Sequence, residues 1–259
     1  MISKSERLLI FRFLFSKKSD GYVSIFAWFS IIGISLGVAA IIIVMSVMNG
    51  FRIDLTNRII GLNSHLNIYS FDNEITNKQA DELILNIDNS FFYQHYKSIE
   101  TNGLIIKSNN SKGVMIKGYD EYDKNHYLFN SINMGALIQN PKSEILIGDS
   151  LANEMNLSVG DKVKIAIPKT DKTILGNIPR FKTLEVVGVF DLGLYEYDSN
   201  LIFLSSELVR KLLLYDEDIY NKIEFFTSSP NEIELFKNKV ELETSNLLLN
   251  FYSISWKDQ

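Results

Sequence analysis

Residues 25–48 read IFAWFSIIGISLGVAAIIIVMSVM, and this stretch decides how the chain is organised. It lies in a run of 31 residues, 21–51, that contains no Asp, Glu, Lys, Arg or His. About 20 such residues cross a bilayer, whereas the apolar core of a signal peptide has only about 7 to 15. A buried helix of a soluble domain is the alternative, but such helices seldom run this far without a polar face. We therefore predict an uncleaved transmembrane helix over residues 23–48.

The charges on either side of the span predict its orientation. Residues 1–20 carry five basic and two acidic side chains, a net charge of +3; because the whole chain carries -5, residues 21–259 carry -8. The excess of basic residues places the N-terminus in the cytoplasm. We expect residues 1–22 to form a cytoplasmic segment with an interfacial helix, and residues 49–259 to lie across the membrane. The charged residues counted before the span are Lys4, Glu6, Arg7, Arg12, Lys17, Lys18 and Asp20.

Two sets of residues within the span suggest more than anchoring. The first set is small and allows another helix to approach closely, as small-xxx-small pairs do. It consists of Ser30, Gly33, Gly37 and Ala40. The second set is large and apolar, and continues at helical spacing toward the outer leaflet. It consists of Ile41, Val44, Met48 and Phe51. From the residues alone, lipid contact is favoured for the second set, and the wall of an apolar substrate cavity is the alternative.

Composition and missing motifs exclude several functions. The chain has 259 residues, 46% of them hydrophobic, and no cysteine, so it contains no disulfide, thiolate metal site or thiol nucleophile. The net charge of -5 gives no support for binding nucleic acid. P-loop, HExxH and GxSxG motifs are absent. We therefore expect no enzymatic activity, no cofactor and no metal.

Isolated candidates for chemistry have simpler explanations. His65, His95 and His126 fall in different predicted elements, which argues against a shared metal. The carboxylates within 191–198 lack a nearby nucleophile motif or cation, and a tyrosine-rich turn between strands accounts for that segment.

The residues after the span predict an α+β domain of strands mixed with isolated helices. One helix follows the capping box formed by Thr76 and Gln79, and a short helix precedes the turn at Gly160 and Asp161. A third helix is capped by Ser206, and a fourth begins at Ser229 and runs to about residue 249. Residues 169–182 interrupt two strand-like runs and should project as a hairpin or long loop. Strands are expected near 64–70, 99–107, 113–118, 144–148, 162–167, 183–190, 201–204, 222–227 and 252–256.

Several motifs, in a consistent order, resemble the LolC/LolE permeases of the lipoprotein-releasing ABC transporter. The most specific is 44–51, VMSVMNGF, which lies near a basic N-terminal segment. The resemblance also rests on 12–16 (RFLFS), 35–40 (SLGVAA), 144–152 (EILIGDSLA), 157–163 (LSVGDKV), 176–180 (GNIPR), 187–190 (VGVF) and 195–198 (YEYD).

This resemblance implies a fold and two sites. The fold is a MacB-like periplasmic domain of two mixed α/β lobes, with the second lobe, about residues 108–205, inserted into the first. The large apolar set from Ile41 to Phe51 would contact the acyl chains of a lipoprotein, which reverses the preference for lipid contact. The excursion at 169–182 would be a hook that binds a periplasmic chaperone. The hook residues implied are Ile174, Leu175, Gly176, Ile178 and Pro179.

The resemblance also implies a location and partners. The chain would be a subunit in the bacterial inner membrane that extracts lipoproteins and passes them to a LolA-type chaperone. Its other partners would be a LolD-type ATP-binding subunit, a second LolC/LolE-type permease, the lipoprotein and membrane lipid, with no nucleic acid. Whether that second permease is another copy of this chain or a different chain stays open, as does the choice of a LolC-like, LolE-like or hybrid role.

Members of that family continue after the region of Trp256 into three further spans, whereas this sequence stops at Gln259. We expect either part of a longer permease or a chain whose remaining spans come from elsewhere. Two alternatives also remain open. One is a MacB-like efflux or FtsX-like regulatory subunit, and the other is a single-pass, membrane-anchored binding module.

Overall fold

A computed structural model describes residues 5–6, 8, 21–62, 64–122, 126–173 and 176–258. For residues 21, 23–24, 55–62, 127, 168–173 and 176–179 it describes the backbone only. The chain divides into two compact units, Met1–Asn57 and Arg58–Gln259, and each is described by itself. Most of the predicted N-terminal interfacial segment lies outside the described residues.

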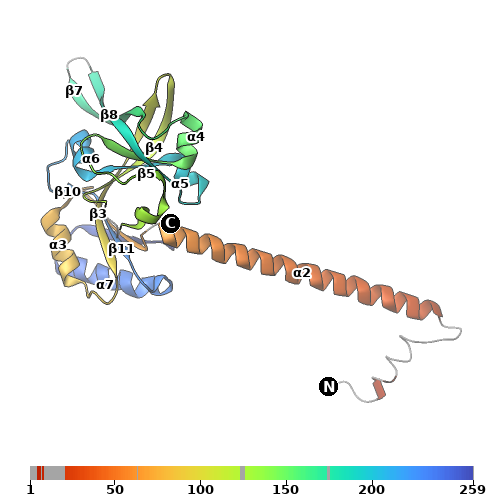
Figure 1. Cartoon of the computed structure of the whole chain (residues 1–259). Helices are drawn as coiled ribbons and strands as arrows, with labels where there is room; N and C mark the ends of the chain where they lie inside the picture. Colours follow the sequence, from red (N-terminus) through yellow and green to blue (C-terminus); the bar gives the residue numbers. More distant parts are fainter. Residues whose placement is uncertain are drawn as a thin grey trace. The chain divides into compact units, whose positions relative to one another are not determined.

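One helix, α2 (Gly21–Leu62), contains the predicted span (Figure 1). Its segment Ile25–Asp54 is long and apolar enough to cross a membrane, and none of its most apolar window is buried. At about 1.5 Å per residue these 30 residues measure about 45 Å, more than the roughly 30 Å hydrocarbon core. The helix continues past Met48 because no proline interrupts residues 49–62. The predicted boundaries at residues 22, 48 and 49 stay predictions.

The second unit is a mixed α/β domain, as the sequence predicts. Its strands are β1 (Leu66–Ser70), β2 (Ile75–Thr76), β3 (Gln94–Lys107), β4 (Asn110–Tyr119), β5 (Ile132–Gly135), β6 (Glu144–Gly148), β7 (Lys162–Thr173), β8 (Gly176–Phe190), β9 (Leu201–Ser205), β10 (Ile219–Tyr220), β11 (Lys222–Phe226) and β12 (Phe251–Ser255). Its helices are α3 (Asn77–Asn86), η1 (Tyr127–Ser131), α4 (Asp149–Met155), α5 (Tyr195–Asn200), α6 (Ser206–Leu213), η2 (Pro230–Glu232) and α7 (Ile233–Asn246).

Ten of the described strands form one continuous sheet in the order β12-β1-β11-β3-β4-β9-β6-β8-β5. The tenth strand, β7, pairs with both β3 and β8, so β3, β4, β9, β6, β8 and β7 close into a ring. Pairing is parallel between β4 and β9 and between β6 and β8, and antiparallel elsewhere in the sheet. The ring and the open part of the sheet share strand β3.

Separate apolar clusters support these two parts of the sheet. The open part packs Leu66, Ile68 and Phe225 against α3 and α7, whose inward residues include Leu83 and Phe236. The ring has its own cluster, drawn from its strands and from α4 and α6. Members of this second cluster include Ile105, Ile116, Ile147, Ile165, Val186, Ile202 and Val209. A third cluster includes Tyr119, Leu128, Phe190 and Phe203. The described part of the domain therefore has three apolar clusters on one sheet, and the limits 108–205 for the inserted lobe stay a prediction.

Local sequence signals account for several element ends. Thr76 and Gln79 form the predicted capping box: the Thr76 backbone N–H donates to Gln79 Oε1 at 2.9 Å, and the Gln79 N–H donates to Thr76 Oγ1 at 3.3 Å. The cap of α6 is Ser205 rather than Ser206, because it is the Ser205 hydroxyl that accepts from Leu208 N–H. The predicted Ser229 side-chain cap is wrong. Pro230 instead begins a 3₁₀ turn, and α7 begins at Ile233 and ends at Asn246.

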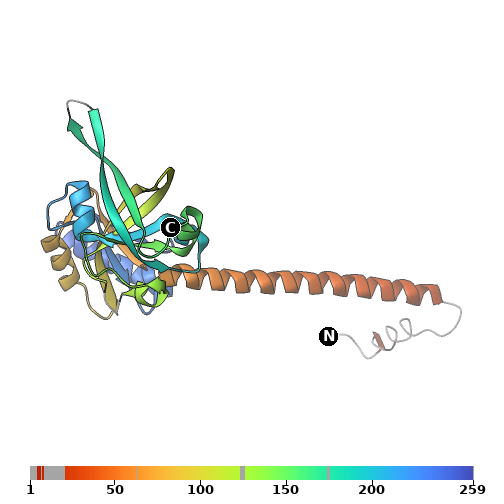
Figure 2. The ribbon, with the colours of Figure 1, turned by 45° about the horizontal axis from the view of Figure 1, so that its top comes forward.

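The excursion that the sequence places at 169–182 continues strands β7 and β8 as a hairpin that extends beyond the rest of the domain (Figure 2). Backbone pairing runs from Lys162 opposite Glu185 to Thr173 opposite Gly176, with a register shift between Ile167 and Thr170. The hairpin is thus a continuous two-stranded arm rather than an irregular loop.

Candidate functional site

The two residue sets within α2 lie on one face of the helix. At about 100° per residue, Ser30, Gly37, Val44 and Met48 fall within about 40° of one another, and the other members within about 100°. The small set occupies the N-terminal half of this face and the large set the C-terminal half. All eight side-chain positions are exposed in this chain. A Cβ atom at Gly33 or Gly37 would meet nothing within 4 Å, so that half of the face has room for another helix.

The predicted hook residues fall on the far end of the β7–β8 arm. Ile174 and Leu175 lie outside the described residues. Gly176, Ile178 and Pro179 lie on β8, where their register partners are Thr173, Asp171 and Thr170. Near the arm's base, Arg180 Nη1 donates a hydrogen bond to the Lys211 carbonyl at 3.2 Å and ties β8 to α6. The roles of the hook and span residues stay predictions.

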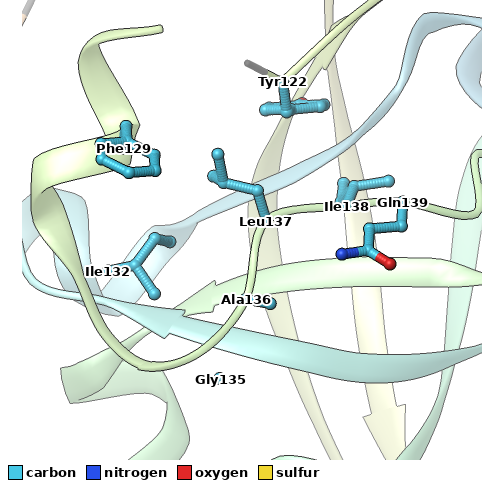
Figure 3. A pocket seen from close by; sticks show the side chains of 8 residues that line it. All are labelled: Tyr122, Phe129, Ile132, Gly135, Ala136, Leu137, Ile138 and Gln139. Carbon is cyan, nitrogen blue, oxygen red and sulfur yellow. The ribbon is translucent and has the colours of Figure 1, made fainter. Parts of the chain in front are cut away.

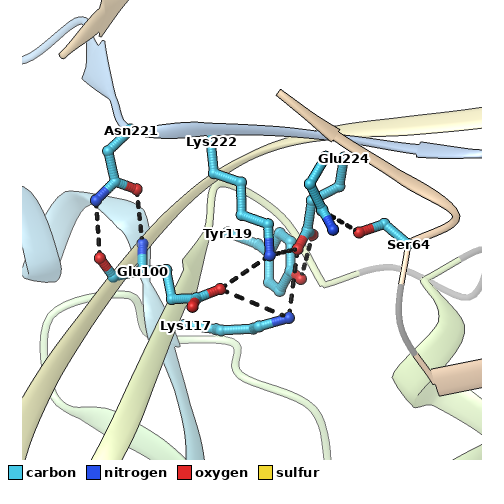
Figure 4. A network of polar contacts seen from close by, with 8 residues as sticks. Ser64, Glu100, Lys117, Tyr119, Asn221, Lys222 and Glu224 are labelled. Atoms are coloured by element: carbon cyan, nitrogen blue, oxygen red, sulfur yellow. Dashed lines mark hydrogen bonds and ion pairs between the residues drawn. The ribbon is translucent and has the colours of Figure 1, made fainter. Parts of the chain in front are cut away.

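A network of buried charges, which sequence reasoning missed, crosses the sheet between β3, β4 and β11 (Figure 4). Lys222 Nζ lies 2.9 Å from Glu100 Oε2 and 3.0 Å from Glu224 Oε1. Lys117 Nζ lies 3.3 Å from the same Glu224 oxygen, and Tyr119 donates to Glu224 Oε2 at 2.6 Å. Two ammonium groups and two carboxylates balance, which is what makes charges tolerable in a protein interior.

These neighbours set the pKa values within the network. Burial by itself raises the pKa of Glu224, but Lys117 and Lys222 outweigh burial and lower it to about 2. Burial lowers the pKa of Lys117, against the opposing effect of Glu224. For Lys222, burial also acts to lower the pKa, yet the carboxylates of Glu224 and Glu100 raise it overall. The network is thus a charge-balanced tie between strands, and no substrate-facing acid or base emerges from it.

The signal for this network was the pattern Lys222-Ile-Glu224-Phe on a strand. Charged and apolar residues alternate along this strand, which predicts that they point to opposite faces of the sheet. In the structure Ile223 and Phe225 pack against the helices, and the charged side chains lie on the other face. No sequence pattern indicated that Glu100 and Lys117 would lie opposite each other in the β3–β4 register.

The other residues considered for chemistry have structural roles. The Asp198 carboxylate accepts from Leu192 N–H at 2.8 Å, and Asp191 accepts from Gly193 N–H at 2.8 Å, so both stabilise the chain entering α5. That segment forms a short helix, α5, rather than only the expected turn. His65 accepts from Thr227 N–H at 2.8 Å. Among the described residues, no group of three or more His, Cys, Asp or Glu side chains could hold a metal ion.

An apolar pocket lies beside the edge strand β5 (Figure 3). Its volume is about 570 Å³, within the roughly 300–1,000 Å³ typical of ligand sites. Its described lining comes from Tyr122, Phe129, Ile132, Gly135, Ala136, Leu137, Ile138 and Gln139. None of these residues is charged, and sequence reasoning did not single out any of them.

Comparison with known proteins assigns the fold to a class. Residues 27–241 match the family described as the MacB-like periplasmic core domain. The chain therefore belongs to the MacB-like periplasmic core domain family.

Particular relatives narrow the similarity. The chain is 29% identical over 213 residues to the lipoprotein-releasing system transmembrane protein LolC of Neisseria meningitidis serogroup B, covering 80% of this chain and 51% of that protein. It is 25% identical over 226 residues to LolE of Haemophilus influenzae, covering 85% and 54%. The resemblance to LolC/LolE permeases is thereby confirmed, and the chain spans about half the length of these relatives.

The structure was also compared with the crystal structure of the periplasmic region of MacB from Actinobacillus actinomycetemcomitans. The aligned region covers 76% of this chain and 91% of that chain. The two share 15% sequence identity and a TM-score of 0.49. At this TM-score the likeness carries no weight in assigning a function.

Proposed function

We propose that this chain supplies the first membrane helix and the periplasmic domain of a permease subunit of a lipoprotein-releasing ABC transporter. The subunit extracts lipoproteins from the bacterial inner membrane and delivers them to a periplasmic chaperone. The observation that carries this proposal is the single face of α2, on which small residues give way to Ile41, Val44, Met48 and Phe51. The similarity to LolC and LolE supports it.

The small residues at one end of that face suit close packing against a neighbouring helix. The larger residues at the other end suit the wall of a cavity. Close approach of a neighbouring helix at Gly33 and Gly37 seals the cytoplasmic half of the cavity. Larger apolar side chains beyond Ala40 hold neighbours apart and offer acyl chains a lipid-like wall. Unbranched, polarisable Met48 adapts to an irregular apolar ligand. In this proposal the chain itself is not an enzyme, and the energy for extraction comes from ATP hydrolysed by a partner subunit.

The test is Met48→Asp, measured as lipoprotein release by the assembled transporter. A carboxylate in the hydrocarbon region costs up to about 3 kcal/mol, and 1.4 kcal/mol already corresponds to a factor of ten, so we expect release to fall at least about tenfold. Membrane insertion and ATPase binding should persist.

Ser46→Asp is the matched control, because Ser46 lies two residues away and faces about 160° from Met48 on the helix. Both variants place a carboxylate at nearly the same depth in the span, so the further loss of release in Met48→Asp beyond that in Ser46→Asp measures the role of the cavity face. Equal release by wild type and Met48→Asp would leave Met48 as a lipid-facing anchor residue and remove the cavity from the proposal.

A further inference from the structure

The apolar pocket beside β5 has a fixed shape. Gly135 adopts a φ of 82°, and a Cβ atom there would lie 2.1 Å from the Val187 carbonyl oxygen. A Cβ atom at Gly188 would lie 2.5 Å from the Ala136 carbonyl oxygen. The two backbones therefore meet closely and form a floor that side chains cannot enter, so the pocket is built by the fold rather than left between mobile side chains.

Three polar groups at the pocket make hydrogen bonds within the protein, and the Gln139 carboxamide is a further polar group of the described lining (Figure 3). The Tyr122 hydroxyl donates to the Leu204 carbonyl at 2.6 Å, which turns the ring toward the pocket as an apolar surface. The Ala136 N–H donates to the Val187 carbonyl at 3.0 Å, and the Gln139 N–H donates to Glu144 Oε2 at 2.7 Å. An occupant would gain apolar contact from Phe129, Ile132 and Leu137 but little hydrogen bonding, which favours hydrocarbon over a polar ligand.

A chain of aromatic contacts links the pocket to the start of the domain. His65, which follows α2 closely in sequence, lies with its ring centroid 5.6 Å from that of Phe226. Phe226 lies 5.8 Å from Tyr96, Tyr96 lies 4.7 Å from His126, and His126 lies 5.0 Å from Tyr122 of the pocket. Within the second unit, these ring contacts connect the pocket to the first residues of the domain.

We propose that this pocket binds an acyl chain of a lipoprotein after the chain leaves the membrane. The inference rests on the proposed function, which supplies the acylated cargo, and adds to it a second apolar site outside the span. An acyl chain that moves from α2 toward a chaperone would otherwise expose its apolar surface to water. That exposure costs about 25 cal/mol of free energy per Å². The pocket lowers that cost by offering a partial shelter.

The experiment uses the full chain in detergent micelles that also contain the probe, so it requires neither extraction from a bilayer nor an ATPase. The probe is a synthetic triacylated lipopeptide that carries a diazirine on one acyl chain; after irradiation, labelled peptides are mapped by mass spectrometry. We expect labelling within residues 126–139. Ala136→Phe fills the pocket from its exposed edge and should abolish that labelling, whereas Asn133→Phe adds the same bulk at an exposed position outside the described lining and should preserve it.

A second variant guards against misfolding of the first. Phe129 is 42% exposed, so Phe129→Glu should leave the core intact while placing a charge in the pocket, and it should also abolish the labelling. Absence of labelling in the wild-type chain would overturn the proposal. So would equal labelling by phosphatidylethanolamine with the same photoreactive chain, because the pocket would then hold membrane lipid.

Competition by the unacylated peptide of the same sequence would overturn it as well, because the occupant would then be polypeptide. These outcomes are independent of the Met48→Asp result. Loss of release in Met48→Asp without labelling of the pocket would remove this site and leave the permease function standing.

Discussion

At the scale of single residues, Glu224 is the buried carboxylate that Lys117, Lys222 and Tyr119 all contact. Its side chain is 1% exposed and lies between Lys117 and Lys222. Glu224→Gln keeps the shape but leaves two buried ammonium groups facing one carboxylate, Glu100. Breaking a buried ion pair from one side costs about 3–5 kcal/mol, so we expect a loss of that order in the free energy of unfolding. Urea unfolding of the full chain in detergent, followed by tryptophan fluorescence, measures it.

The same substitution changes the dependence of stability on pH. The folded-state pKa of Glu224 is about 2, below the ordinary value of 4.5. Its stabilising contribution is therefore complete above about pH 4.5 and is lost as the pH falls toward about 2. Glu224→Gln should flatten the stability profile in this window. Glu185→Gln, at an exposed carboxylate on β8, should change stability by less than about 0.5 kcal/mol, and an equal effect of the two would contradict the role given to the network.

At the scale of elements, the β7–β8 arm carries the chaperone prediction. Because ladder pairing extends to Thr173 and Gly176, the arm presents the residues near its tip at a defined distance from the domain. A photoreactive residue at Ile178 should cross-link to a LolA-type chaperone, and Pro179→Arg should weaken chaperone binding at least about tenfold, a loss of about 1.4 kcal/mol. Both are measured with the purified full chain and chaperone.

The control for this arm is Thr183→Arg, which adds the same charge to an exposed position on β8, nearer the domain. It should bind the chaperone like the wild type. If Pro179→Arg binds as tightly as Thr183→Arg, the hook assignment fails, although the arm itself remains.

At the scale of the whole molecule, the orientation in the membrane is the open prediction. The chain has no cysteine, so single cysteines can report position without background. Asn109, exposed at the β3–β4 turn, should react as cysteine with a membrane-impermeant maleimide in intact spheroplasts. Ser5, before the span, should react as cysteine only after the membrane is permeabilised. The reverse pattern would place the domain in the cytoplasm and contradict both the positive-inside argument and the proposed delivery to a chaperone.

Features of the fold that depend on neighbouring residues in the sequence were predicted from the sequence. The span follows from a run without charges, the start of α3 from Thr76 and Gln79, and the strands from alternation and turn residues. Each of these signals acts over a few residues, where local geometry and solvation decide the outcome. The predicted helix caps at Ser206 and Ser229 were wrong by only a few residues. Several adjacent residues are able to cap a helix, and only the packed backbone selects one of them.

Tertiary structure alone decided what depends on distant segments. The closure of the ring through β3 and β7 joins residues about 60 positions apart, and the ionic network joins β3 and β4 to β11, more than 100 positions away. The pocket likewise needs β8 to pair with β5, with Gly135 opposite Gly188 where the backbones approach closely. The sequence by itself determined an anchored α/β domain with an arm, because those features are local. Strand register determined the network and the pocket, since only register brings these side chains together.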